Sequence, residues 1–169
     1  MLILGIDPGT ALTGYGVVER KTDGRLAALA WGCIRTAPGE AMPTRLATIH
    51  RELTLLLRQH KPDFLAIEEL FFNKNARTAL TVGQARGVAL LAAAHEGVSV
   101  WEYTPLEIKQ AVAGHGRAPK RQIQRMVATL LNLKAPPEPD DVADALAVAI
   151  CHAQFYNFKG IVLGSRGQP

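Results

Sequence analysis

Carboxylates stand at positions of this 169-residue chain where burial would penalise them. Asp7 follows the apolar run Leu2–Ile6 and is itself followed at once by Pro-Gly-Thr. Glu68 and Glu69 interrupt the apolar run that begins at Phe64. A lone buried carboxylate costs several kcal/mol of folding free energy or stays protonated, and a group of them needs a neutralising cation.

Two further acids lie in the segment DDVADALAVAI, which is apolar on nearly every side of a helix. Asp141 and Asp144 are spaced i, i+3 and therefore share a helix face. Hard divalent cations, Mg²⁺ first, take oxygen ligands and would neutralise such a group. Together with Asp7 and the glutamates at 68–69, this pair could converge on one metal centre. Such a centre matches two-ion phosphodiester hydrolysis, in which one ion activates water and the other stabilises the leaving oxygen.

Each acid also has a purely structural interpretation. Asp7 is able to form an Asx turn ahead of Pro-Gly. Asp140 is suited to cap a helix, and Asp141 to complement the helix dipole. Neighbouring side chains of a strand face opposite ways, so only one of Glu68 and Glu69 can face a given side of a sheet. Spacing alone leaves these alternatives open.

The hydrophobic pattern predicts the elements that would position these acids. Apolar runs predict five strands, and the Asp-Gly in the turn Thr22–Arg25 predicts a hairpin; the expected strands are Leu2–Ile6, Gly14–Glu19, Leu26–Ile34, Phe64–Leu70 and Val98–Tyr103. Helical spacing and capping signals predict five helices, over Pro43–His60, Ala76–Glu96, Pro105 to about Gly114, Pro119 to about Leu133 and Asp140 to about Phe155. Three meandering strands followed by alternating helices and strands predict one α/β domain, with a five-stranded mixed sheet flanked by helices.

Composition narrows the class of protein. The hydrophobic fraction of 48% supports a sizeable core. No apolar run approaches the ~18 residues that a membrane span needs, and the first residues lack a signal-peptide pattern. We therefore expect a soluble, cytoplasmic protein with no membrane partner. Cys33 and Cys151 are far apart and belong to no zinc-ligand pattern, so we expect free thiols.

Positive charge is concentrated in one part of the chain, whose formal net charge is +4. The segment Ile108–Pro137 contains no Asp or Glu, and its basic residues are Lys109, Arg117, Lys120, Arg121, Arg125 and Lys134. This distribution predicts a basic face suited to nucleic acid, although a solvated surface would give the same pattern.

Four sequence blocks carry a resemblance to a known family. They are GIDPGTALTGYGVVE, IEELFFNKNARTALTVGQARGVA, IKQAVAGHGRAPKRQI and DDVADALAVAI. In this order, from Leu2 to about Cys151, they resemble the RuvC-type Holliday junction resolvases, or crossover junction endodeoxyribonucleases. The resemblance implies an RNase H-like nuclease domain over residues 1–158, and we expect residues 159–169 to form a flexible tail.

The resemblance also implies an activity and partners. It implies Mg²⁺-dependent incision of two like-polarity strands of a four-way DNA junction, in homologous recombination and DNA repair. Mn²⁺ is the expected substitute, and two ions are expected in each active site when substrate is bound. The resemblance implies a homodimer, and branch-migration helicase proteins are further candidate partners. The expected helix Ala76–Glu96 offers an apolar surface for a second copy, at Ala79, Val82, Ala89 and Ala93.

Position by position, the resemblance assigns roles to individual residues. The metal-binding and catalytic acids would be Asp7, Glu68, Asp141 and Asp144. Lys109 would be catalytic as well, steadying the charge that develops on the scissile phosphate. Phe71 would stack on bases near the junction centre, although a core position at the end of a strand is the alternative. The other expected DNA contacts are Phe72, Lys74, Arg77, Arg117, Lys120 and Arg121.

Three other functions share part of this pattern. The opening GIDPGT also resembles the phosphate loop of the actin, sugar-kinase and chaperone ATPases, which need two such lobes. An RNA-processing nuclease branch shares the opening Asp but not the FFNKNA loop followed by the GQARG helix. A non-catalytic junction-binding module is the third, and the acids argue against it, because uncompensated negative charge beside DNA weakens binding.

Overall fold

The sheet of this protein has five strands in the order β3-β2-β1-β4-β5. In the computed structural model, which describes residues 1–69 and 76–163, the strands are β1 (Leu2–Asp7), β2 (Leu12–Arg20), β3 (Leu26–Arg35), β4 (Phe64–Glu68) and β5 (Ser99–Tyr103). The first three strands are antiparallel neighbours, whereas β4 runs parallel to β1 and β5 parallel to β4. The prediction of a five-stranded mixed sheet is confirmed.

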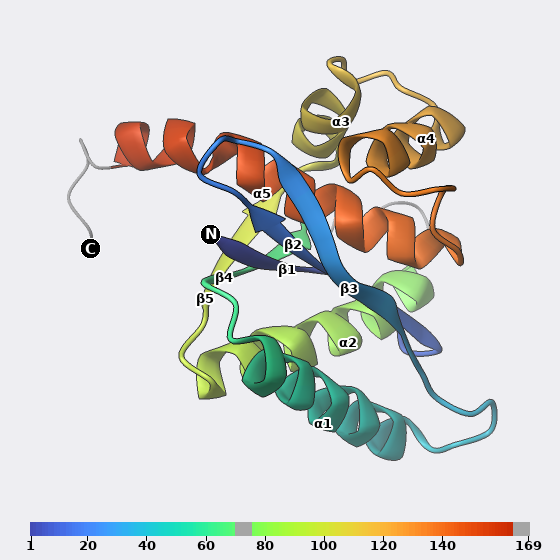
Figure 1. Cartoon of the computed structure of the whole chain (residues 1–169). Coiled ribbons are helices and arrows are strands. Elements are labelled where there is room, and N and C mark those ends of the chain that lie inside the picture. Colours follow the sequence, from blue (N-terminus) through green and yellow to red (C-terminus); the bar gives the residue numbers. More distant parts are fainter. Residues whose placement is uncertain (70–75, 164–169) are drawn as a thin grey trace.

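Helices cover both faces of the sheet (Figure 1). They are α1 (Met42–His60), α2 (Ala76–His95), α3 (Pro105–Ala113), α4 (Lys120–Leu130) and α5 (Asp140–Leu163). Helices α1 and α2 lie on one face, and α3, α4 and α5 lie on the other. Each face has its own apolar core, so the sheet is the middle of three layers. None of the described helices is long and apolar enough to cross a membrane.

Local sequence signals set the element boundaries. Gly24, at a φ of 84°, forms the turn between β2 and β3, where the Lys21 N–H donates to the Arg25 carbonyl. Helix α3 begins with a capping box: Glu107 N–H donates to the Thr104 hydroxyl, and the Glu107 carboxylate accepts from Thr104 N–H. These boundaries agree with the sequence predictions.

Two expectations about helix ends were wrong. Helix α5 continues to Leu163, beyond the expected end near Phe155, so the interval expected as a tail begins inside this helix. Asp140 is the first residue of α5 instead of the residue before it, and its carboxylate accepts a hydrogen bond of 2.7 Å from Gln124 on α4. The tertiary contact with α4 therefore replaces the expected capping role.

The buried face of helix α2 also differs from the expectation. Ala89 and Ala93, which we expected to face a second copy, are fully buried against the sheet together with Leu4 and Leu65. This helix is rich in Ala and Leu on all sides, so periodicity could not identify the face that packs on the sheet. Both cysteines are free thiols, as expected.

Helix α5 lies unusually close to β1 and β2. A Cβ atom added at Gly5 would stand 2.0 Å from the carbonyl oxygen of Ala145, and one added at Gly14 would stand 2.1 Å from that of Asp141. Both glycines therefore allow the helix backbone to rest directly on the strands. Because Gly14 is paired with Asp7 across β1 and β2, this contact brings the first turn of α5 to the end of β1.

We predict that Gly14→Ala lowers the free energy of unfolding by at least about 2 kcal/mol, because the added methyl group overlaps helix backbone that cannot rotate away. Urea unfolding monitored by circular dichroism measures this change. Gln59→Ala is the control, since Gln59 is exposed on α1 and the change places alanine, a good helix former, away from the core. Equal stability of the two variants would contradict the close-contact interpretation.

Candidate active site

Two of the acids lie at the ends of adjacent parallel strands. Asp7 is the last residue of β1 and Glu68 the last residue of β4. Gly5 is paired with Ala66, and Gly5 contacts α5. Because side chains alternate along a strand, Asp7 and Glu68 face the α5 side of the sheet as well. The strand geometry thus selects Glu68 rather than Glu69 for this side.

Helix α5 brings the other two acids to the same place. Asp141 and Asp144 lie in its first turns, and the backbone of Asp141 is in contact with Gly14, beside Asp7. Burial and, to a smaller extent, the carboxylates of Asp144, Asp141 and Glu68 together raise the pKa of the Asp7 carboxyl from 3.8 to about 7. Burial is also the largest cause that raises the pKa of Glu68 and of Asp144. The four acids therefore form one electrostatically coupled group.

Lysines lie beside these carboxylates. The Lys120 Nζ is 3.0 Å from Asp144 Oδ2 and 3.2 Å from Asp140 Oδ2. Burial opposes the charged ammonium group, but the hydrogen bonds and charges of these two carboxylates keep the pKa of Lys120 above its ordinary value. Lys109 and Lys120 both act to lower the pKa of Glu68, against the stronger effect of burial.

A small cleft of about 290 Å³ contains the charged groups of both signs. Glu68, Asp144, Lys109 and Lys120 line it, and its remaining walls come from Pro105, Ile108, Ile123 and Ala147. Lys120 and Arg121 occupy the first turn of α4, which contains no acidic residue. Cations at a helix N-terminus are disfavoured by the helix dipole, so their position is not explained by helix stability.

The donor chemistry of this cluster fits a hard divalent cation. All four acids offer oxygen ligands, and their mutual repulsion in a buried place would be relieved by a cation. As the described side chains stand, however, no three Asp, Glu, His or Cys residues surround a single point at which an ion could be held. The Lys120 ammonium instead supplies the positive charge next to Asp144.

The remaining expected site residues differ in how far the structure describes them. Arg117 is exposed in the segment between α3 and α4, and Arg121 is exposed on α4, so both flank the cleft along the chain. Arg77 lies in the first turn of α2, with its side chain outside the description. Phe71, Phe72 and Lys74 lie outside the described residues.

The sequence did not predict the ion pair between Lys120 and Asp140. Asp140 was interpreted only as a helix cap, whereas its carboxylate bonds Gln124 and pairs with Lys120, both on α4. These contacts tie the N-terminus of α4 to that of α5. No periodic signal could have revealed them, since the two helices are joined through an irregular Pro-rich segment.

Comparisons with known proteins agree on one family. The family described as "Crossover junction endodeoxyribonuclease RuvC" matches residues 3–152. A protein of that name from Moorella thermoacetica is 64% identical over 92% of this chain and 92% of its own length. One from Pelotomaculum thermopropionicum is 60% identical over 94% of this chain and 96% of its own.

Solved structures show the same likeness in three dimensions. The RuvC structure from Thermus thermophilus has 38% sequence identity and a TM-score of 0.87, covering 94% of this chain and 97% of that one. The T. thermophilus RuvC in complex with Holliday junction substrate has 35% identity and a TM-score of 0.86, covering 94% of this chain and 96% of that one. The expected RNase H-like fold is thereby confirmed.

We predict that Asp7→Asn stabilises the metal-free protein at alkaline pH. The pKa of Asp7 is higher in the folded than in the unfolded state, so the unfolding free energy falls as pH rises from about 4 through about 7. The amide side chain of the variant does not ionise, so the variant keeps the unfolding free energy that the wild type loses. A difference of ~1–2 kcal/mol corresponds to a melting temperature that is roughly 3–8 °C higher in the variant. Thermal unfolding in EDTA at about pH 8.5 and about pH 5 measures it, and the difference should be smaller at the lower pH, where only part of the loss has occurred.

Glu40→Gln, at an exposed position, controls for loss of a negative charge. An Asp7→Asn variant whose melting temperature matches wild type at both pH values would show that Asp7 is not destabilised by its surroundings.

Proposed function

Because the chain belongs to the RuvC family of crossover junction endodeoxyribonucleases, we propose that it is a structure-specific endonuclease that resolves four-way DNA junctions. It hydrolyses one phosphodiester bond in each of two like-polarity strands, in homologous recombination and DNA repair. The T. thermophilus relative solved with its Holliday junction substrate supports this assignment of substrate. The reaction then takes place in the cytoplasm, where the DNA of the bacterial relatives lies.

The observation that carries the proposal is the meeting of Asp7, Glu68 and Asp144 in one buried, coupled group beside two lysines. A purely structural network would pair each acid with a base, whereas Asp7 has no ion-pair partner among the described residues, and burial and neighbouring carboxylates raise its pKa. Asp7, Glu68, Asp141 and Asp144 would hold Mg²⁺, or Mn²⁺ in its place, with two ions in each active site when substrate is bound. When bound, the ions supply an activated water and stabilise the leaving oxygen.

The side chains of the cleft prepare the substrate for this chemistry. Lys109 and Lys120 contact the scissile phosphate and stabilise the charge that develops on its oxygens. With a cation held by Asp144, Lys120 would no longer be needed to neutralise that carboxylate and could turn its ammonium group to the phosphate. Burial around Asp7 limits the water that competes for these charges.

The wider DNA interface extends from the basic segment around the cleft. Arg117 and Arg121 are exposed on segments near Lys120 in the chain, and we assign them phosphate contacts. We assign Phe71 and Phe72 to base stacking, and Lys74 and Arg77 to phosphates, on the family pattern alone. The RNA-processing and ATPase alternatives lose support, because the matched family covers residues 3–152 and carries the junction-cutting name.

Paired incision requires two active sites, and we propose a homodimer that uses the exposed face of α2. Leu80 and Leu91 are 66% and 48% exposed, and Gly87 lies between them with open space around its Cα. These positions are spaced i, i+7 and i+11, so they lie on one side of the helix. Branch-migration helicases remain proposed partners without an assigned surface.

Incision of a labelled synthetic four-way junction tests the proposed function directly. With Mg²⁺, paired nicks confined to the junction are expected, and EDTA should abolish them. Linear duplex and structured RNA serve as competing substrates. Cutting of RNA alone would support the RNA-processing branch, and tight junction binding without cutting would support a binding module; either result contradicts the proposal.

We predict that Glu68→Gln lowers the incision rate by at least roughly 100-fold, because a metal ligand and a negative charge are lost together. Junction affinity in gel-shift assays should not fall, since the variant removes negative charge near DNA. Glu69→Gln is the matched control one residue along, and should cut at a rate close to wild type. Equal rates for the two variants would remove Glu68 from the site.

We predict that Leu91→Glu converts the dimer to monomer, because it places a charge within the apolar contact. Analytical ultracentrifugation measures the change in mass, and paired incision should become single nicking. Leu55→Glu is the control, since Leu55 is similarly exposed at 52% but lies on α1. A dimer unaffected by Leu91→Glu would place the interface elsewhere.

A further inference from the structure

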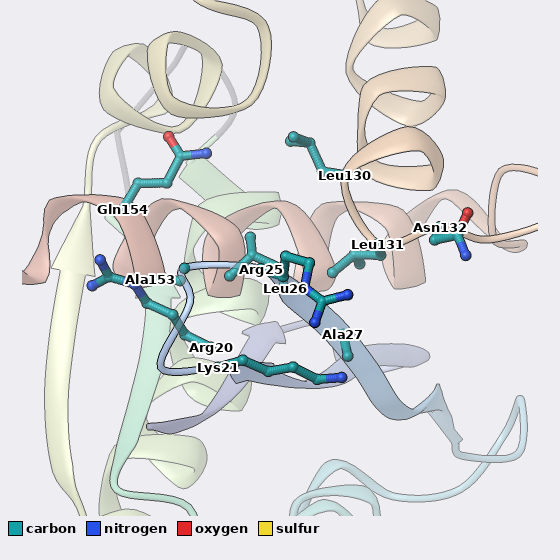
Figure 2. Close-up of a pocket in the computed structure, with 11 residues that line it drawn as sticks. Arg20, Lys21, Arg25, Leu26, Ala27, Leu130, Leu131, Asn132, Ala153 and Gln154 are labelled. Carbon is teal, nitrogen blue, oxygen red and sulfur yellow. The ribbon is translucent and has the colours of Figure 1, made fainter.

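A second, larger cleft lies at the opposite end of α4 from the candidate active site. Its volume is about 720 Å³, and it is enclosed by the turn between β2 and β3, the C-terminal end of α4 and the middle of α5 (Figure 2). Along α5, Ala153 in this cleft is separated from Asp144 by about 13 Å of helix rise. The cleft is therefore a separate feature, and the proposed junction chemistry does not use it.

The rim of this cleft is basic. Arg20, Lys21 and Arg25 line it from the β2–β3 hairpin. Arg25 is paired with Asp23, at 2.7 Å between its Nη2 and Oδ2. Among the described residues no carboxylate lies within ion-pair distance of Arg20 or Lys21. Asp23 also interacts electrostatically with Lys21, so one carboxylate stands against three basic side chains and the rim keeps a net positive charge among the described residues.

The inner surface of the same cleft is largely apolar. Leu26 and Ala27 contribute from β3, and Leu130 and Leu131 from the end of α4. Leu131 is buried at 4% exposure, whereas Leu26 and Leu130 are half-buried and reach the opening. Apolar walls inside a charged rim are typical of a pocket that receives an apolar side chain flanked by charges of the opposite sign.

We propose that this cleft docks an acidic peptide segment of a partner protein, with an apolar side chain of the segment inserted between β3 and α4. Charge complementarity selects a negatively charged ligand, since among the described residues Asp23 offsets only part of the positive charge of Arg20, Lys21 and Arg25. A DNA phosphate would satisfy the rim but leave the apolar walls without a contact. A peptide with acidic residues around a Leu or Phe satisfies both.

The adjoining strand offers the peptide a path beyond the cleft. Strand β3 is at the edge of the sheet, with a strand partner only at β2 among the described elements. Further along this strand, Leu29 and Trp31 are 53% and 44% exposed. An edge strand with exposed apolar side chains is suited to pair with an added, extended segment.

Selection from a display library of random linear peptides on the full chain tests the proposal without assuming a ligand. Enrichment of acidic residues around an apolar residue is the expected consensus. The consensus peptide, labelled with fluorescein, is then titrated with the protein by fluorescence anisotropy. We expect saturable binding that weakens with added salt, and loss of binding when the apolar residue of the peptide is replaced by Ser.

Variants locate the binding in the cleft. R20E/K21E should lower the affinity for the consensus peptide by at least about tenfold, because two attractive rim charges become repulsive. At the exposed rim position Gln154, Q154E should weaken binding and Q154R should strengthen it, with no change to the core. R51E on α1 is the control for loss of positive charge on another face. Junction incision should be unchanged in all of these variants.

The possible results separate this proposal from the junction-cutting function on which it does not depend. Peptide binding that is lost in R20E/K21E but retained in R51E, with normal incision, supports the docking site. Absence of an acidic and apolar consensus, or equal peptide affinity in R20E/K21E and wild type, overturns it. Weakened junction binding in R20E/K21E without any peptide consensus also overturns it, and assigns the rim to DNA.

Discussion

The backbone contact of helix α5 with strands β1 and β2 is the constraint on which the rest of this structure depends. Gly5 and Gly14 leave room for helix carbonyl groups where any side chain would collide. With the helix seated there, its first turns carry Asp141 and Asp144 to the strand ends that carry Asp7 and Glu68. A small change in the height of the helix would separate the acids, so the packing of two glycines sets the geometry of the proposed chemistry.

That geometry has an electrostatic cost, which the lysines partly offset. The carboxylates of Asp144, Asp141 and Glu68 add to the effect of burial in raising the pKa of Asp7. Lys120 neutralises part of this charge through Asp144 and Asp140, and its position at the start of α4 is otherwise unfavourable. A site that is destabilising without its cation and substrate is a common consequence of selection for activity.

Much of this arrangement could be predicted from the sequence, because its signals are local. The strand that ends in Asp7, the Asp-Gly hairpin and the Thr104 capping box all follow from short-range rules. The buried face of α2 could not be predicted, since Ala and Leu surround that helix. The pairing of Asp140 with Lys120 depends on how two helices pack, and the second cleft is formed by segments far apart in the chain. No local pattern encodes such contacts.

Anomalous X-ray diffraction would show directly whether the coupled carboxylates bind a divalent cation. Crystals of the protein bound to a junction with hydrolysis-resistant scissile linkages would be soaked in Mn²⁺. We predict anomalous density within ligating distance of carboxylate oxygens of Asp7, Glu68 and Asp144, with Lys120 no longer paired to Asp144. Absence of density at these acids while Mn²⁺ binds elsewhere on the protein would contradict this prediction.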